Sequence, residues 1–460
     1  MSFLGVDVGT TGTKALLVDE YGRVKASVTH EYATSHPQPL WAEQDPNDWW
    51  EAAQRSIEEA AHHDVEGVGL TGQMHGLVLL DDKGEVLRPC IMWNDQRTER
   101  QCAEIAAKAD PLGLTGNPVL PGFTAPKILW VREHEPDVYR RISKVLLPKD
   151  YLRYRLTGQF LSDVSDASGT SLFDVKRRTW SQEMLDALEI PRAWLPEVTE
   201  SAEVSATVRD GPLTGVPVVG GAGDQAAQAL STGAVKEGIV SVTLGTSGVV
   251  FAASDRYRVD PRLHSFCHAV RGKWHLMGVM LSAAGSLRWY RDLMGNEPYD
   301  RLIADAAPSS EGVIFLPYLS GERTPHADPH AKGVFFGLTV RHTKAHLTRA
   351  VLEGVAFGLR DSLELMREQG MTFNQVRVSG GGAKSEIWLR ILADVFNTEI
   401  VTVGVTEGAA YGGALLAMPE RPEPVVSEPI CPGPGAEAYG ATYQRYTALY
   451  PALETLFHNV

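Results

Sequence analysis

Two segments that lie far apart in this chain have nearly the same form, and they limit the folds that it can adopt. Residues 4–14 read LGVDVGTTGTK, and residues 242–250 read VTLGTSGVV. Each is an apolar strand, a tight turn of glycine, threonine and serine, and a second apolar strand. Such a turn can direct backbone N–H groups and hydroxyls at a phosphate. The pair predicts two halves that hold one polyphosphate from opposite sides.

The length of the chain predicts two large domains. With 460 residues, the chain is too long for a single hydrophobic core. A second strand meander begins near Lys236, and we place the boundary there. We therefore expect a first domain over residues 1–236, a second over residues 237–425, and a C-terminal tail with a last helix over residues 426–460.

Charge and cysteine content exclude several classes of protein. A net charge of −14 argues against a nucleic-acid-binding protein, because phosphate backbones require basic surfaces. The N-terminus lacks the pattern of a secretory signal, and no apolar run is long enough to cross a bilayer. The cysteines have no metal-ligand spacing, which favours a reducing, cytoplasmic compartment; they are Cys90, Cys102, Cys267 and Cys431.

Strand and helix patterns alternate along the chain. Asp45 and Pro46 suit the N-cap and first position of a helix that we expect to run to about residue 61. A strand with a glycine-rich end that leads into a helix occurs twice, over residues 216–230 and 376–396. This alternation predicts a mixed α/β architecture in both halves.

Asp7 and Asp224 are the central pair of candidate catalytic residues. Both follow apolar strands and lie among glycines, and the glycine-rich strand ends of α/β sheets are where ligands bind. Either residue alone is as well explained by capping a turn or a helix. Together with the two phosphate-type turns, they favour phosphoryl transfer, in which Asp7 suits a magnesium ion and Asp224 suits a base.

Other motifs are less specific. The segment 380–383, Gly-Gly-Gly-Ala, opens a helix and suits either an anion or a plain strand-to-helix turn. The segment 93–97, Trp-Asn-Asp-Gln-Arg, has the composition of a sugar site, but a turn capped by Asp95 explains it equally well. We interpret His62 and His63 as structural or surface residues.

Several of these motifs resemble the FGGY carbohydrate kinases, over residues 3–416. The resemblance is carried by DVGTTG at 7–12, PLWAEQDP at 39–46, GQMHG at 72–76, PGFTAPK at 121–127, LPKDY at 147–151, YLSGERTP at 318–325 and GGGA at 380–383. It implies two ribonuclease H-like domains of the actin and hexokinase type, each a mixed sheet flanked by helices, with a nucleotide cleft between them. Within the family, these stretches are most similar to those of members that phosphorylate D-xylulose.

The resemblance also implies the reaction and the roles of particular residues. The reaction is transfer of a phosphoryl group from ATP, with Mg²⁺, to D-xylulose. Asp224 would be the base, and Asp7 would lie near the magnesium. The ketose site would be lined by Met74, His75, Asp224 and Gln225. The nucleotide would be contacted by Thr10, Thr11, Gly245, Thr246, Gly381 and Gly382.

Two comparisons within the family bear on the sugar. Glycerol kinases carry an Arg-Glu pair where this chain has Met74 and His75, which argues against glycerol. Some members that phosphorylate xylulose have Asn where this chain has Gln225. The alternatives are a kinase for another ketopentose or sugar alcohol, and a non-catalytic nucleotide- or sugar-binding sensor on the same fold. A homodimer is an expectation from the family resemblance, and no residue of the sequence points to it.

Overall fold

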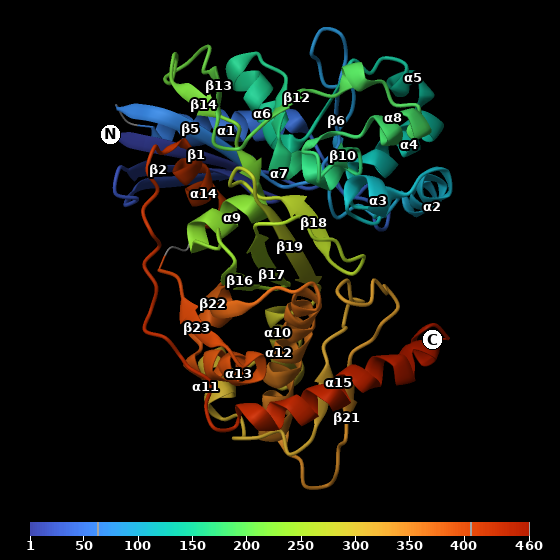
Figure 1. Ribbon diagram of the computed structural model, residues 1–460, viewed down its shortest axis with the longest axis vertical. Helices are drawn as coiled ribbons and strands as arrows, with labels where there is room; N and C mark the ends of the chain where they lie inside the picture. Colours follow the sequence, from blue (N-terminus) through green and yellow to red (C-terminus); the bar gives the residue numbers. More distant parts are fainter. Residues whose placement is uncertain (62–63, 405–406, 460) are drawn as a thin grey trace. The chain divides into compact units, whose positions relative to one another are not determined.

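The computed structural model describes residues 1–61, 64–404 and 407–459. The interpretation of His62 and His63 lies outside these described residues. The chain divides into two compact units that alternate along the sequence, and Figure 1 colours the chain from blue at the N-terminus to red at the C-terminus. Unit 1 comprises Met1–Ser231, Ser265–Trp274 and Glu407–Glu423, and unit 2 comprises Thr232–His264, His275–Thr406 and Pro424–Val460.

The sheet of unit 1 contains the predicted strand-turn-strand segment of residues 4–14 as β1 and β2. Its strand order is β13-β14-β5-β1-β2-β3, and β15 pairs with β5. Strand β1 runs antiparallel to β2 and parallel to β5. The β1–β2 turn and the carboxyl end of β5 therefore lie at the same edge of the sheet. The strands are β1 Ser2–Val8, β2 Gly12–Asp19, β3 Val24–Glu31, β5 Val65–Gly72, β13 Val204–Thr207, β14 Pro217–Val219 and β15 Ala222–Gly223.

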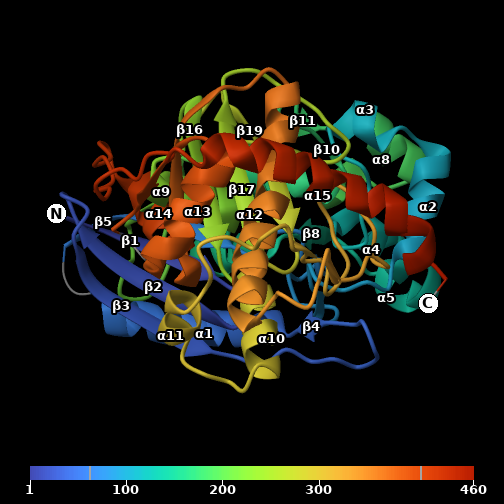
Figure 2. The same ribbon diagram turned by 90° about the horizontal axis from the view of Figure 1, so that it is seen from below.

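Helices cover both faces of this sheet. Helix α1, Pro46–Ala60, begins as predicted after Asp45, whose side chain accepts a hydrogen bond from the Asn47 N–H. Helix α14, Gly408–Ala417, lies so close to β1 that a Cβ on Gly5 would be 1.8 Å from the Ala410 oxygen. Figure 2 shows α1 and α14 on either side of the blue strands. The glycine therefore allows the close approach of this helix.

The rest of unit 1 is a helical region with short strand pairs. Helix α9, Asp224–Thr232, follows β15 directly. The segment Ser265–Trp274 is held to this unit by the Asn117 side chain, which bonds both the N–H and the carbonyl of Ser265. The other elements include α2 Glu99–Lys108, α3 Pro111–Thr115, α4 Thr124–His134, α5 Pro136–Tyr139, α6 Pro148–Thr157, α7 Val164–Ala167, α8 Gln182–Leu188, β6 Val78–Leu80, β8 Lys144–Leu146 and β9 Leu161–Asp163.

The sheet of unit 2 follows the same plan. Its strands run in the order β19-β17-β16-β22-β23, with β16 antiparallel to β17 and parallel to β22. The strands are β16 Gly238–Leu244, β17 Gly248–Ser254, β19 Trp274–Met280, β22 Phe373–Ser379 and β23 Glu399–Thr402. The helices are α10 Ala284–Leu293, α11 Tyr299–Ala304, α12 Lys344–Glu368, α13 Glu386–Phe396 and α15 Ala436–Phe457.

The last helix, α15, is fixed to unit 2 by a row of tyrosines. The hydroxyl of Tyr439 donates to Glu353 over 2.7 Å, and that of Tyr443 donates to Asp361 over 2.6 Å. The proline-rich segment 419–434 before the helix is mainly exposed. No helix in the described part of the chain is both long and apolar enough to span a membrane.

Candidate active site

The strand register of unit 1 places Asp7 and Asp224 at the same edge of the sheet. Asp7 pairs with Thr71 on one side of β5, and Ala222 pairs with the same threonine on the other side. Asp224 comes directly after β15 and begins α9. Asp7 therefore lies near the carboxyl end of β1 and Asp224 directly follows β15, the two strands that flank β5. The carboxyl ends of strands are where α/β sheets bind ligands.

Asp7 is held by the strand next to it. The Thr71 hydroxyl donates to a carboxylate oxygen of Asp7 over 2.9 Å. Burial raises the pKa of Asp7, and the threonine bond and the positive charge of Lys14 only partly oppose this shift. A negative charge on Asp7 is thus under-compensated within the protein, and a cation would stabilise it.

Asp224 has an ionisation suited to a base. Burial is the main cause that raises its pKa to about 7, and the negative charge of Asp7 adds to the shift. The backbone and side chain of Gln225 oppose it by hydrogen bonding to the carboxylate. A general base works best when its pKa lies near the pH at which the enzyme operates. Asp224 can therefore accept a proton near neutral pH.

Met74 and His75 lie next to the segment that precedes Asp224. A Cβ on Gly223 would meet the Met74 sulfur at 2.9 Å, so the methionine packs over that glycine. The ring of His75 stacks on Phe123 with centroids 4.6 Å apart, and its Nδ1 lies 2.7 Å from the Gly169 oxygen. The structure therefore places Met74 against the residue before the predicted base, and both Met74 and His75 against Gly169.

Two residues that sequence reasoning did not single out fix the backbone of His75. The His75 backbone is in the left-handed region, with φ of 70°, which is uncommon for a residue other than glycine. Its carbonyl accepts hydrogen bonds from Lys127 Nζ at 3.0 Å and from the Thr124 hydroxyl at 3.1 Å. Lys127 is fully buried, and burial lowers its pKa to about 7. A lysine within the apolar stretch 125–131 was the available sequence signal.

A buried charged cluster also borders the segment before Asp224. Lys149 Nζ lies 2.9 Å from Asp163 and 3.5 Å from Asp166. Burial raises the pKa of Asp166 well above its ordinary value, although Lys149 lowers it. The neighbouring Ser165 hydroxyl oxygen accepts a hydrogen bond from the Gly223 N–H at 3.1 Å. This cluster therefore supports the backbone that carries Asp224, and neither spacing nor composition identified it.

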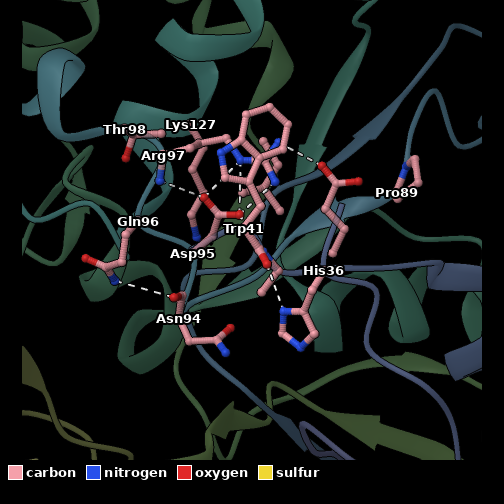
Figure 3. Close-up of polar contacts among 12 residues, drawn as sticks. His36, Trp41, Pro89, Asn94, Asp95, Gln96, Arg97, Thr98 and Lys127 are labelled. Atoms are coloured by element: carbon pink, nitrogen blue, oxygen red, sulfur yellow. Dashed lines mark hydrogen bonds and ion pairs between the residues drawn. The ribbon is translucent and has the colours of Figure 1, made fainter. Parts of the chain in front are cut away.

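The Trp-Asn-Asp-Gln-Arg segment serves mainly as a capped turn. Asp95 accepts from the backbone and side chain of Arg97 and from the Ala42 N–H. The Arg97 guanidinium lies 3.6 Å from the centroid of the Trp41 ring, and Figure 3 shows these side chains together. The Trp93 indole donates to the Thr10 hydroxyl over 3.1 Å. Asp95 thus has the capping role, while Trp93 contacts the first phosphate-type turn.

The second phosphate-type turn and the triple glycine lie together in unit 2. Thr243 of β16 pairs with Ser379 of β22, so both segments follow neighbouring parallel strands. Gly380 has φ of 90°, and a Cβ there would lie 2.7 Å from the Leu244 oxygen. Gly381 has no atom within 4 Å of the position where a Cβ would lie. The backbone of Gly381 is therefore open to a ligand.

The carboxylate of Asp7 fits a magnesium ion whose other ligands are phosphates of the substrate. Among the described residues there is no group of three or more His, Cys, Asp or Glu side chains arranged to bind a metal ion. Mg²⁺ in kinase sites is commonly held by one or two carboxylates together with substrate phosphates. The under-compensated carboxylate of Asp7 is a donor of this kind.

Comparison with known proteins gives the family. Residues 2–231 match the N-terminal domain, and residues 240–419 the C-terminal domain, of the FGGY family of carbohydrate kinases. The chain belongs to this family and is a carbohydrate kinase. The predictions of the family and of a two-part α/β fold are thus confirmed.

Similar proteins cover nearly the whole chain. A xylulose kinase of Escherichia coli (strain K12) is 45% identical over 98% of this chain and 97% of its own length. A xylulose kinase of Klebsiella pneumoniae is 46% identical over 90% of this chain and 89% of its own length. The crystal structure of xylulose kinase from Rhodospirillum rubrum has a TM-score of 0.93 and 31% identity, and covers 100% of both chains.

Proposed function

We propose that the chain transfers the γ-phosphoryl group of ATP to O5 of D-xylulose. The observation that carries this proposal is the position of Asp224, which has a pKa of about 7 and directly follows Gly223, against which Met74 packs. The similarity to curated xylulose kinases supports the choice of sugar. We assign the sugar site and the base to residues 1–236 and the nucleotide turn to residues 237–425.

The reaction needs one base and an in-line approach. Asp224 accepts the proton of the O5 hydroxyl while O5 forms a bond to the γ-phosphorus. The bond between that phosphorus and the β–γ bridging oxygen breaks, and ADP leaves with that electron pair. Burial around Asp224 keeps its carboxylate poorly solvated, which makes it a stronger base than an exposed aspartate.

The remaining residues bind and orient the substrates. Met74 offers an apolar surface, and the bond from His75 Nδ1 to the Gly169 carbonyl fixes the imidazole ring. Gln225 holds the Asp224 carboxylate in place by hydrogen bonding. We assign the phosphates to the turn amides and hydroxyls of Thr10, Thr11, Gly245, Thr246, Gly381 and Gly382. Mg²⁺ held at Asp7 would neutralise phosphate charge.

A coupled ADP-release assay with Mg-ATP tests this function. The panel comprises D-xylulose, L-xylulose, D-ribulose, L-ribulose, xylitol, D-arabitol, gluconate and glycerol. Turnover with D-xylulose well above the rest is expected. Turnover with another member alone would keep the kinase and change the sugar. ATP binding without turnover of any sugar would favour the non-catalytic sensor.

Location and assembly are part of the same proposal. The four cysteines are free thiols, as in chains of a reducing compartment, and we place the enzyme in the cytoplasm. We also propose a homodimer on the basis of the family resemblance. Light scattering of the purified protein gives the molar mass, and a value for a single chain would reject the dimer.

A further inference from the structure

We infer that Gln44 and Gln73 are positioning residues that aim the amides of the first phosphate-type turn at the ATP phosphates. Both side chains are buried, with 2% exposure each. The inference rests on the proposed function, because a polyphosphate must be the group that this turn meets. Neither glutamine has to touch the substrates, since both act on the backbone of the turn.

The carbonyl groups of the turn are held from behind by side chains. The Gly9 oxygen accepts from the Tyr32 hydroxyl at 2.6 Å and from Gln73 Nε2 at 3.3 Å. The Thr10 oxygen accepts from Gln44 Nε2 at 2.7 Å. Two consecutive peptide oxygens are thus bonded by side chains from β4 (Glu43–Gln44) and from the residues that directly follow β3 and β5.

The bonded carbonyls determine where the next amides point. In a trans peptide, the C=O and the following N–H point in opposite directions. The Gly9 carbonyl therefore sets the direction of the Thr10 N–H, and the Thr10 carbonyl sets that of the Thr11 N–H. Neither N–H has a protein acceptor in the part of the chain that the structure describes. The two amides are presented together on the side away from the glutamines.

The orientation of both side-chain amides is fixed by chemistry. An indole N–H only donates, and Trp49 Nε1 bonds Gln44 Oε1 at 2.9 Å. The Nε2 of Gln44 must therefore face the Thr10 oxygen. Gln44 Oε1 also accepts from Gln73 Nε2 at 3.1 Å, which leaves the second hydrogen of that amide for the Gly9 oxygen. A flip of either glutamine would break these bonds.

One group of this hydrogen-bond network destabilises the folded protein. Gln73 Oε1 is buried and has no hydrogen-bond partner among the described residues. A buried acceptor without a partner is unfavourable, so an apolar side chain of the same length would avoid that cost. Gln73 also directly precedes Met74 and His75, so one segment carries the sugar residues and supports the phosphate turn.

The test replaces each amide by a thioether of similar length. Gln73→Met and Gln44→Met should lower kcat for D-xylulose about tenfold or more, because small misplacement of a positioning group is costly in the transition state. The KM for D-xylulose should stay within a few-fold. Gln101→Met is the matched control: Gln101 is also buried, bonds Glu133, and has an unpartnered Oε1.

A merely structural role predicts a different result. It would lower the melting temperature and the active fraction of both variants without a selective loss of kcat, as in the Gln101 control. Tyr32→Phe removes another donor to the Gly9 oxygen and should reproduce the kcat loss. It also keeps the inference testable if a glutamine variant does not fold. Unchanged kcat in all three turn variants would overturn the inference.

Nucleotide binding separates this inference from the proposed sugar. Calorimetry with ATP and AMP should show that the turn variants lose affinity for ATP and keep that for AMP, because AMP lacks the terminal phosphates. This result is expected even if the wild-type protein phosphorylates none of the sugars tested, which would reject the proposed function alone. An ATP-to-AMP affinity ratio equal to that of the wild type would reject the role of the glutamines.

Discussion

Asp7 lies near the end of β1 and Asp224 directly follows β15, the two strands that flank β5, and the negative charge of Asp7 helps to raise the pKa of Asp224 to about 7. Burial of Asp224 contributes more to this pKa shift than the charge of Asp7 does. In the proposed function, Asp7 would hold the magnesium ion and Asp224 would act as the base. A cation bound at Asp7 would offset the charge that opposes ionisation of Asp224.

The first prediction concerns pH dependence. Asp224 must be ionised to accept a proton, so kcat/KM of the wild type should fall as the pH drops below about 7. Asp7→Asn removes a like charge, which lowers the pKa of Asp224 and moves this acidic limb to lower pH. A pH profile of kcat/KM measures the shift. An acidic limb at an unchanged pH would show that Asp7 does not act on the base.

The second prediction concerns replacement of the base. Asp224→Asn should lower kcat by about 10²–10⁴, the usual contribution of a general base. The pKa of Asp224 is raised in the folded protein. The wild type therefore loses stability as the pH rises from about 4 to about 7. The Asp224→Asn variant does not, because its side-chain amide stays neutral.

The melting temperature of Asp224→Asn relative to the wild type measures this second effect. The difference should grow across that pH range and then remain constant. A difference that does not change with pH would show that Asp224 is not the titrating group. Unchanged turnover would remove Asp224 from the mechanism.

Sequence patterns predicted the parts of the fold that depend on local order. The meander of β1, β2 and β3 and the start of α1 at Pro46 are visible because apolar alternation and capping residues are local. That α14 packs on Gly5, and that Ser265–Trp274 joins unit 1, depends on contacts between residues far apart in the chain. No short-range pattern encodes such contacts.

The residues of the candidate site also divide into those that local patterns predict and those whose role depends on distant contacts. Asp7 and Asp224 were singled out because they lie among glycines next to apolar strands. Met74 and His75 were expected only from the resemblance to the FGGY carbohydrate kinases. Lys127 was not visible, because its role depends on a carbonyl in another element. Its place within the apolar stretch 125–131 was a signal of burial, but that signal does not show which carbonyl the lysine bonds.

The third prediction concerns the His75 ring. A Cβ on Gly169 would lie 2.4 Å from His75 Nδ1 and 2.3 Å from its Cε1. The His75 ring is stacked on Phe123 and bonded to the Gly169 carbonyl, so it can move away from the new methyl group only by breaking these contacts. Gly169→Ala should raise the KM for D-xylulose about tenfold or more, if the overpacking costs at least about 1.4 kcal/mol, and leave the KM for ATP nearly unchanged.

A double-mutant cycle with His75→Ala identifies the route of this effect. If Gly169 acts through the imidazole, the two substitutions together should raise the KM for D-xylulose little more than His75→Ala alone. Additive losses would show that the alanine disturbs the site by another path. Circular dichroism provides the check that each variant retains its secondary structure.

The fourth prediction separates ligand contact from fold at the triple glycine. Gly381 has open space where a Cβ would lie, whereas a Cβ on Gly382 would be 2.4 Å from the Leu244 side chain. Gly381→Ala should therefore keep the melting temperature and raise the KM for ATP about tenfold, if the new methyl group costs about 1.4 kcal/mol of phosphate contact. Gly382→Ala should lower the melting temperature as well. Gly440→Ala in α15, also in open space, is the control for both, and an ATP KM for Gly381→Ala equal to that of this control would place the nucleotide away from the backbone of Gly381.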